Sequence, residues 1–219
     1  MVVPERRTQA VRTAESHRRL VDAAIKLLAE RGYASTTLVE IGRTAELSRG
    51  LVTYHFATKE ACMEAVIVTI GDRLHEMILP VVDGARGLAA LDGIIDVYFD
   101  QLGSEDAALR AMYTVLIEAV SAAPGLRAAT AEINQSFRDL VAGLVVQAIE
   151  DGDVSGQVLP EVCAILIEGI VRGVATQWLI SASLVDLEVV VPVLKRAIRR
   201  SITGPGTGQE ARESQRRVI

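Results

Sequence analysis

The sequence predicts an all-α protein of about nine helices, in which an N-terminal three-helix helix-turn-helix domain precedes a larger helical domain. Apolar residues recur at helical spacing along most of the chain, and Gly and Pro fall mainly between these segments. Hydrophobic residues make up 50% of the chain but aromatic residues only 4%, so the core consists chiefly of Leu, Ile, Val and Ala. A length of 219 residues suits one large domain or two small ones.

Charge is distributed unevenly along the chain. The net charge is −5, which by itself argues against a nucleic-acid partner. Residues 1–60, however, contain ten Lys or Arg and seven Asp or Glu, a balance of +3, whereas residues 61–219 contain thirteen and twenty-one, a balance of −8. A basic N-terminal region followed by an acidic body is expected when only the first domain binds DNA.

The N-terminal region begins with a basic segment. Residues 1–13 are predicted to be a disordered arm, whose arginines belong either to a solvated tail or to an arm that enters the DNA minor groove. The helix-turn-helix domain is predicted to span residues 14–60. Its first helix has Leu20 and Leu27 at helical spacing and ends at Gly32.

Two short helices joined by a tight turn follow. Thr37 and Glu40 have the spacing of a capping box. In this motif the Thr hydroxyl accepts a hydrogen bond from the Glu backbone amide, and the Glu carboxylate accepts one from the Thr backbone amide. Ser48 caps the next helix, where Val52 and Phe56 share the inner face. The outer face carries donors, a small residue and aromatic side chains in place of the Glu and Lys pairs of a solvated face. That inventory suits phosphates and base edges.

These residues and their flanks resemble the DNA-binding domain of the TetR family of transcriptional regulators. The resemblance rests on LVDAAIKLLAERG at 20–32, SRG at 48–50, YHF at 54–56 and TKE at 58–60. It implies a homodimer that binds a palindromic double-stranded DNA operator, as a repressor, and is released by a small-molecule effector. The DNA-binding residues implied by the resemblance are Thr37, Ser48, Arg49, Gly50, Leu51, Thr53, Tyr54, His55 and Lys59.

Two residues depart from the family pattern. Glu46 stands where the family has the turn glycine, and a positive φ costs a non-Gly residue about 1 kcal/mol, so the turn either accepts the strain or is built differently. Thr53 stands where a tyrosine is common, and its shorter side chain suits a thymine methyl group better than a phosphate. These departures bear on the operator sequence rather than on the mode of binding.

The larger domain is predicted to span residues 61–203 and to bind the ligand and form the dimer. A helix that begins at Thr58 and breaks at Pro80 connects the two domains. Residues 204–219 are rich in Gly, Pro and charge and are predicted to be a disordered tail. The remaining helices are expected at 88–102, 105–122, 125–151, 159–182 and 186–202.

The last two helices are predicted to form the dimer interface. Segment 159–182 is apolar on more than one face, so it is either central in its own monomer or packed against a second copy. The resemblance to TetR proteins favours a four-helix bundle between two copies. The predicted interface residues are Val162, Leu166, Gly169, Gly173, Leu187, Val190, Val191, Leu194 and Ile198.

The effector is predicted to bind within the larger domain, which resembles the BetI-type branch of the family around Trp178. The founding case of that branch responds to a choline-derived signal. Ordinary core packing also explains each aromatic residue or Met, and Glu168 can pair with Arg172 four residues on. An unpaired carboxylate near Trp178 would instead favour a cationic ligand. The candidate lining residues are Tyr98, Met112, Tyr113, Glu118, Phe137, Glu168 and Trp178.

The sequence gives little support for an enzyme, a metalloprotein or a membrane protein. His17, His55 and His75 stand alone, so we expect no enzyme, cofactor or metal site. Cys62 and Cys163 are expected to be reduced core residues. We also expect a cytoplasmic protein with no membrane span, because the most apolar segment is interrupted by charged residues. The alternative hypothesis is a ligand carrier or interaction protein of this fold that does not bind DNA.

Overall fold

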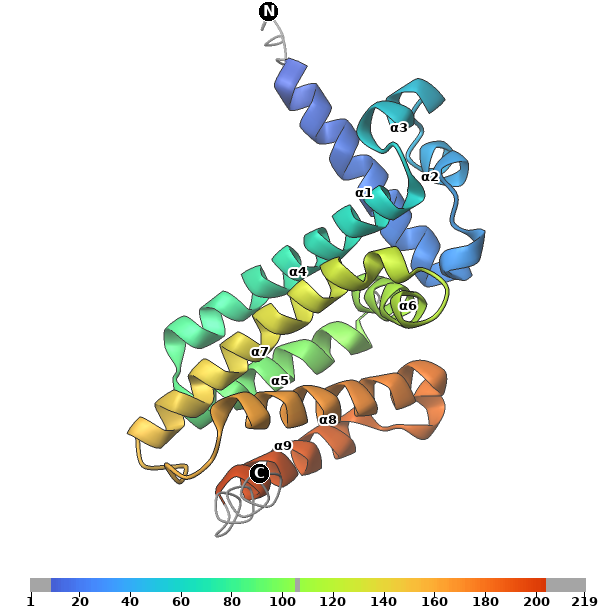
Figure 1. Ribbon diagram of the computed structural model, residues 1–219. Coiled ribbons are helices and arrows are strands. Elements are labelled where there is room, and N and C mark those ends of the chain that lie inside the picture. Colours follow the sequence, from blue (N-terminus) through green and yellow to red (C-terminus); the bar gives the residue numbers. More distant parts are fainter. Residues whose placement is uncertain (1–8, 105–106, 204–219) are drawn as a thin grey trace, which may run out of the picture. The chain divides into compact units, whose positions relative to one another are not determined.

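The computed structural model describes residues 9–104 and 107–203 (Figure 1). Within these residues every regular element is a helix and no strand occurs, so the predicted all-α class is confirmed. The described residues form two compact units. One combines 9–72 with 107–131, and the other combines 73–104 with 132–203.

The first unit contains the helix-turn-helix. It extends beyond the predicted domain of residues 14–60, because α6 packs along α1 and joins the same unit. Fully buried Leu20, Leu27, Ile41 and Met63 contribute to its core. Its elements are α1 (Gln9–Ser35), α2 (Leu38–Thr44), α3 (Arg49–His55), the first part of α4 (Lys59–Gly84), α6 (Ala108–Val120), the 3₁₀ turn η1 (Pro124–Leu126) and the start of α7 (Arg127–Glu150).

Both ends of α1 differ in detail from the sequence prediction. The helix begins at Gln9, so residues 9–13 are helical and the prediction of disorder for them is wrong, whereas residues 1–8 lie outside the described residues. Gly32 has φ 75° and ψ 177°, which interrupts the helix at the predicted residue before a last turn through Ser35. The left-handed φ explains the glycine at this position.

Helix α4 does not break at Pro80, contrary to the prediction. It continues to Gly84 with the proline inside it. A proline removes only its own amide from the helical ladder, and Pro80 is exposed, so water can reach the carbonyl that loses its donor.

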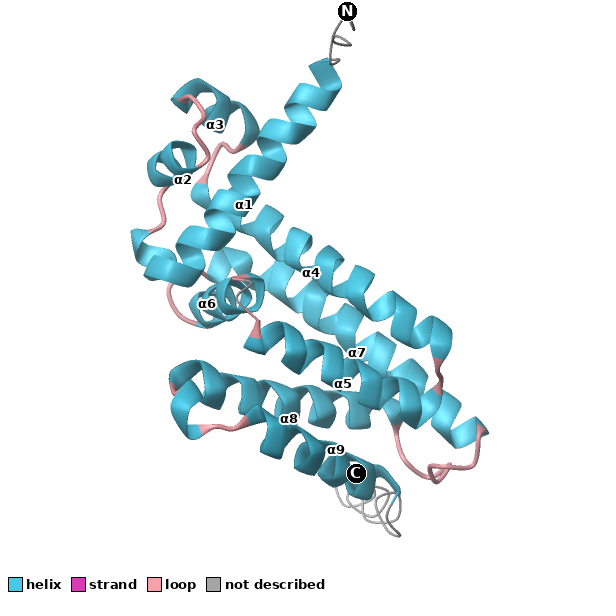
Figure 2. Cartoon of the chain, turned by 180° about the vertical axis from the view of Figure 1, so that it is seen from behind, coloured by secondary structure: helices cyan, strands magenta, loops and turns pink. Residues whose placement is uncertain are grey.

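The second unit is a set of long helices. Its elements are the end of α4, α5 (Gly87–Gly103), most of α7, α8 (Pro160–Ile180), the 3₁₀ turn η2 (Ala182–Leu184) and α9 (Leu187–Thr203). Helices α8 and α9 lie side by side, and both contact α5 (Figure 2). The five helices from α5 to α9 begin and end within three residues of their predicted bounds. The predicted tail, 204–219, lies outside the described residues.

Ion pairs join α5 to α9. Lys195 Nζ lies 2.7 Å from both carboxylate oxygens of Asp96, and Arg199 Nη2 donates to Asp92 Oδ2 at 2.6 Å. The hydrogen bond that Arg199 donates to Asp92 raises the pKa of Arg199 above its usual value. Leu194 and Ile198 are buried on the same helix, so α9 is attached within its own chain by both apolar and charged contacts.

Helix α8 is the most apolar of the long helices that the structure describes. Among the described residues it is the one helix long and apolar enough to cross a membrane, and about a third of its most apolar window is buried. It also carries Glu168 and Arg172, which form an ion pair. The same composition suits a helix that another protein helix covers.

Both cysteines are buried, as expected from their apolar surroundings. Burial raises the pKa of the Cys62 thiol to about 12 and also raises the pKa of Cys163. A thiol with a raised pKa is a poor nucleophile at neutral pH.

Candidate nucleic-acid interface

The turn between α2 and α3 is a Schellman motif. The amide of Glu46 donates to the carbonyl of Arg43 at 3.1 Å, and the amide of Leu47 donates to the carbonyl of Gly42 at 2.9 Å. The motif needs one residue with left-handed backbone. Glu46 takes it with φ 54°, and it is the one non-Gly residue with positive φ in the part of the chain that the structure describes. Of the two predicted alternatives, the turn accepts the strain.

Arg19 of α1 contacts this turn. Its Nη2 donates to the carbonyl of Ala45 at 2.5 Å and lies 3.8 Å from Glu46 Oε2. Ala45 is the C-cap of α2, where carbonyl groups lack partners within the helix. The guanidinium group therefore supplies a donor to a helix end next to the strained residue.

A glycine allows α2 and α3 to approach closely. Gly42 is buried, and a Cβ at this position would lie 2.7 Å from Val52 Cγ2. Any larger residue would push α3 away from α2.

Helix α3 presents a polar outer face. Its N-cap is Ser48, whose hydroxyl accepts from the amide of Leu51 at 3.3 Å, as predicted. Tyr54 is 71% exposed. The Thr53 hydroxyl donates to the carbonyl of Arg49 at 3.1 Å, which leaves its methyl group as the part free to meet a base. The exposed residues of α3 are Arg49, Gly50, Thr53 and Tyr54.

His55, at the end of α3, is bound to α1. Its Nε2 lies 2.7 Å from the hydroxyl oxygen of Ser16, and the Ser16 hydroxyl donates to the carbonyl of Thr13 at 2.9 Å. A hydroxyl has one hydrogen, so the pair is satisfied when His55 Nε2–H donates to Ser16. The His17 ring lies edge-on, with its centroid 5.5 Å from that of His55. Burial, and then the nearby His17, lower the pKa of His55.

Lys59, at the start of α4, is also engaged within the unit. Its Nζ donates to the carbonyl of Tyr33 at 2.5 Å and lies 3.7 Å from the centroid of the Tyr33 ring. Burial lowers the pKa of Lys59, while Glu60 and Glu118 act in the opposite direction. Lys59, which the family resemblance implies as a DNA-binding residue, therefore has a partner within the protein.

The capping box at α2 is half formed. Thr37 caps the helix by accepting from the amide of Glu40 at 3.2 Å, as predicted. The Glu40 carboxylate instead lies 2.7 Å from Arg43 and 3.4 Å from Arg31. The Glu40 carboxylate, which was predicted to accept from the Thr37 amide, pairs with these two arginines instead.

The nine residues predicted to contact DNA thus lie in α3, at the caps of α2 and α3, and at the start of α4, all in the first unit. Arg49, Gly50 and Tyr54 are exposed, whereas His55 and Lys59 are half-buried and bonded within the protein. Sequence reasoning missed Ser16 and Arg19. Ser16 is a buried polar residue four positions before Leu20 on the inner stripe of α1, and a polar residue on such a stripe needs a partner.

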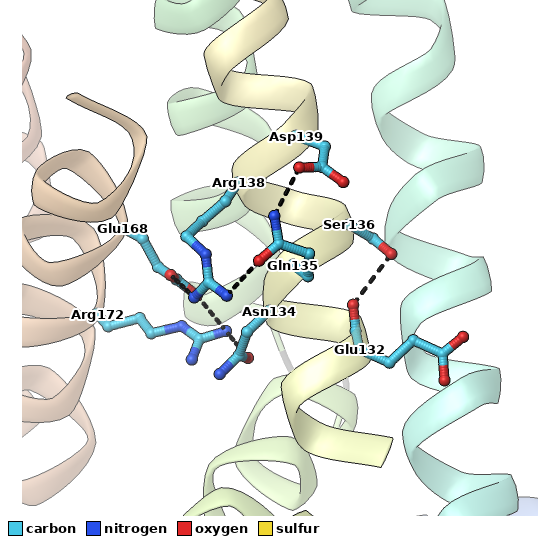
Figure 3. Close-up of polar contacts among 8 residues, drawn as sticks. All are labelled: Glu132, Asn134, Gln135, Ser136, Arg138, Asp139, Glu168 and Arg172. Atoms are coloured by element: carbon cyan, nitrogen blue, oxygen red, sulfur yellow. Dashed lines mark hydrogen bonds and ion pairs between the residues drawn. The ribbon is translucent and has the colours of Figure 1, made fainter. Parts of the chain in front are cut away.

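In the second unit, a polar cluster surrounds the buried Glu168 (Figure 3). Arg138 of α7 donates to Glu168 Oε2 at 3.0 Å, and Arg172 Nη2 lies 3.0 Å from Glu168 Oε1. The same Nη2 donates to Asn134 Oδ1 at 2.8 Å, and the buried Oε1 accepts no hydrogen bond from the described residues. The predicted pairing with Arg172 is confirmed, and Arg138 is a second partner that the spacing along α8 could not reveal.

The other residues predicted to line a ligand site fall in both units. Met112 and Tyr113 are buried in α6, and Glu118 is half-buried there, where its charge acts on Tyr33 and Lys59. In the second unit, Tyr98 is buried in α5, while Phe137 of α7 and Trp178 of α8 are half-buried.

A groove of about 240 Å³ lies between α5 and α9. None of the predicted ligand residues lines it. Its lining residues are Asp96, Phe99, Asp100, Leu187, Glu188, Val191 and Pro192.

The residues predicted for the dimer interface divide into two groups. Val162, Leu166, Gly169 and Gly173 of α8 are exposed, and open space surrounds both glycines. Leu187 and Val190 are half-buried. Val191, Leu194 and Ile198 of α9 are buried inside their own chain, so the apolar stripe of α9 faces inward and these three residues are not part of an exposed face.

The geometry of the first unit is that of a helix-turn-helix protein, and comparison with known sequences agrees. Residues 20–66 match the family described as bacterial regulatory proteins, tetR family. Residues 87–203 match the family described as BetI-type transcriptional repressor, C-terminal. The chain belongs to the tetR family of bacterial regulatory proteins and has a BetI-type C-terminal domain.

Individual relatives match over part of their length. The regulator CymR of Pseudomonas putida is 39% identical over 75 residues, which cover 34% of this chain and 35% of CymR. The regulator BetI of Escherichia coli O17:K52:H18 is 30% identical over 97 residues, 43% of this chain and 50% of BetI. The chain therefore spans about a third to a half of the length of these relatives.

Solved structures share the fold. A complex of SmeT with triclosan has a TM-score of 0.75 at 20% identity and covers 88% of this chain and 93% of SmeT. SmeT is the repressor of a multidrug efflux pump of Stenotrophomonas maltophilia.

Proposed function

We propose that the chain is a homodimeric, sequence-specific DNA-binding repressor that binds a palindromic operator through the helix Ser48–His55. A small molecule bound in the C-terminal domain releases it. We place the DNA-binding function in residues 14–60 and the ligand and dimer functions in 61–203, in a cytoplasmic protein. The observation that supports this most is the outer face of α3, where exposed Arg49 and Tyr54 follow a capped and tightly packed turn.

Base recognition is assigned to Arg49, because a guanidinium group can donate two parallel hydrogen bonds to the edge of a guanine. Gly50 would let the backbone approach the groove. The methyl group of Thr53 would meet a thymine methyl, because its hydroxyl is already bonded to the Arg49 carbonyl. Thr37, Ser48, Tyr54, His55 and Lys59 would meet phosphates.

Binding to operator and to random DNA tests this assignment. Arg49→Ala is expected to reduce the preference for operator over random DNA by roughly 1–3 kcal/mol. Equal losses on both DNAs would contradict base recognition by Arg49. Arg43→Ala is a matched control, because Arg43 is an exposed arginine in the same unit that is paired with Glu40.

The alternative, a carrier that does not bind DNA, makes a different prediction for salt. For a protein that neutralises several phosphates, the logarithm of the binding constant falls linearly with the logarithm of the salt concentration, with a slope near −0.9 per phosphate. Gel-shift titration from low to high salt measures this slope. A flat dependence would favour the carrier.

The partner of α8 is proposed to be a second copy of the chain. Val162, Ile165, Leu166 and Ile170 are exposed along one side of the helix, and Gly169 lies among them with open space around it. Two copies would cover these side chains and place two α3 helices about 34–36 Å apart, one turn of DNA. Sedimentation at micromolar concentration tests the dimer, and a monomer that persists with operator present would overturn it.

The effector is proposed to be uncharged and apolar rather than cationic. A cation site at Glu168 would need that carboxylate to be free, but Glu168 already lies within 3.0 Å of two guanidinium groups (Figure 3). A crystallised complex of SmeT, a structural neighbour, contains triclosan. Calorimetric titration with neutral apolar compounds and with quaternary amines decides between the two classes, and tighter binding of the amines would overturn the assignment.

Release is proposed to follow from a two-state equilibrium of the dimer. The ligand can weaken operator binding only to the extent that it binds more tightly to the state with the wrong spacing of the two α3 helices. Operator affinity measured with and without a saturating ligand tests this.

A further inference from the structure

We propose that Ser16 and Arg19 are positioning residues for base recognition, which hold the recognition helix α3 at its last residue and at the turn that precedes it, from a single turn of α1. This inference rests on the proposed function. Ser16 binds the last residue of α3, His55, with 2.7 Å between the hydroxyl oxygen and Nε2. Arg19 donates to the carbonyl of Ala45, in the turn that precedes α3, at 2.5 Å.

The two residues are three positions apart, so they lie on the same side of α1 about one turn from each other. Helix α3 is only seven residues long, and two buried apolar side chains anchor it, Val52 and the C-cap Phe56. Apolar packing is non-directional, so a small pivot of so short a helix about these contacts costs little free energy. The two polar contacts, one on each side of Val52 along the chain, oppose such a pivot.

The Arg19 contact has a second effect, because it acts beside the strained Glu46. With φ 54°, Glu46 favours any rearrangement that returns it to negative φ, and that rearrangement would open the Schellman turn. Arg19 holds the carbonyl just before Glu46 in place. The residue thus fixes the point from which α3 starts.

Neither residue needs to contact DNA for this role. Ser16 is buried, and Arg19 donates through Nη2 to the protein backbone at Ala45. Their loss should therefore change how well α3 is placed against the bases, and not the number of phosphates that the protein neutralises. Reading of base edges depends on side-chain position far more than general attraction to phosphates does.

Arg18 provides a matched control for Arg19. It lies on the same turn of α1, carries the same charge, and pairs with Glu15 within the helix at 2.9 Å, with a side chain that is 65% exposed. Arg18→Ala and Arg19→Ala change the charge of the unit equally. Any difference between them reports the contacts of Arg19 with the turn, at Ala45 and Glu46.

The test measures the affinities of the full-length dimer for its selected operator and for random DNA at several salt concentrations. Arg19→Ala is expected to reduce the operator-to-random ratio about tenfold, the effect of roughly 1.4 kcal/mol, whereas Arg18→Ala leaves the ratio unchanged. The salt slopes of the two variants should be equal. Arg19→Lys, which keeps the charge and one donor, should recover part of the ratio.

Several outcomes would overturn the proposal. One is an equal ratio for Arg19→Ala and Arg18→Ala, and another is a smaller salt slope for Arg19→Ala, which would identify Arg19 as a phosphate contact. If Arg19→Ala proves too unstable to assay, Ser16→Ala decides, with the exposed Ser35→Ala as its control, and equal ratios for these two would also refute it. A wild-type protein without operator preference would refute the proposed function itself, a result distinct from the others.

Discussion

Helices α3 and α8 both carry exposed residues with an assigned partner, but they differ in chemistry and in how they are held. The outer face of α3 is polar, and hydrogen bonds from α1 together with a close glycine contact fix the helix. The outer side of α8 is apolar, and the helix is held by buried side chains such as Ile167 and Val171 together with the polar cluster around Glu168, which joins it to α7.

The difference follows from what each partner requires. Hydrogen bonds to base edges tolerate little error in position, so a recognition helix needs directional contacts on its inner side. An apolar interface gains free energy in proportion to the area that it buries, and many neighbouring placements bury a similar area. Directional support under α3 and a largely apolar setting for α8 would each suit the partner proposed for that helix.

The largest expected effect comes from a charge placed on the outer side of α8. Leu166→Glu should weaken self-association at least about 100-fold, because an unpaired carboxylate buried in an interface costs about 3 kcal/mol or more. Sedimentation equilibrium measures the change. Val68→Glu in α4 is the control, because Val68 is 57% exposed and Leu166 is 58% exposed. Equal effects of the two variants would show that α8 is not part of the interface.

A methyl group between α2 and α3 should have the next largest effect. Gly42→Ala is expected to lower the free energy of unfolding by about 1–3 kcal/mol, because its Cβ would lie 2.7 Å from Val52 Cγ2. Gly143→Ala in α7 meets no atom within 4 Å and should stabilise the protein by about 0.5–1 kcal/mol. Urea unfolding measures both variants, and the same sign for both would contradict the close approach of α2 and α3.

Relief of the strained turn should have a smaller effect of the opposite sign. Glu46→Gly is expected to raise the free energy of unfolding by roughly 0.5–1 kcal/mol, because glycine adopts positive φ without steric cost. The lost pair with Arg19 is long and exposed and contributes little. Glu30→Gly, the same change within regular α1, should instead destabilise by about 1 kcal/mol. A destabilised Glu46→Gly variant would show that the side chain has another role.

The smallest expected effect is a dependence of stability on pH. The pKa of His55 is lowered in the folded unit, so below its ordinary value of 6.5 the unfolded chain binds more protons than the folded one. The free energy of unfolding should therefore decrease as the pH falls through about 6.5 and level off below the folded pKa. Thermal unfolding between pH 8 and pH 5 measures this contribution. It should be absent in His55→Gln and present in His75→Gln, since His75 is exposed.

Sequence reasoning reached those features that depend on neighbours along the chain. The caps at Thr37 and Ser48, the stop at Gly32 and the pairing of Glu168 with Arg172 all involve residues within a few positions of each other. Helical periodicity also placed the five later helices to within three residues.

Features that depend on contacts between distant segments were out of reach. The inward direction of the α9 stripe depends on α5, which lies about a hundred residues earlier in the chain. The second partner of Glu168 comes from α7, and the supports of α3 come from α1. The sequence of an apolar stripe, or of a single Ser, does not indicate which distant segment it contacts. These contacts could therefore be found only in the three-dimensional structure.

The buried state of both cysteines makes the protein convenient for spectroscopy. With Cys62 fully covered and its thiol pKa raised to about 12, maleimide reagents have little native thiolate to attack near neutral pH. One cysteine introduced at an exposed position such as Ala34 would then take a spin label selectively in an otherwise unaltered chain. In the proposed dimer, the distance between two such labels would measure the separation of the two N-terminal units, with and without the proposed effector.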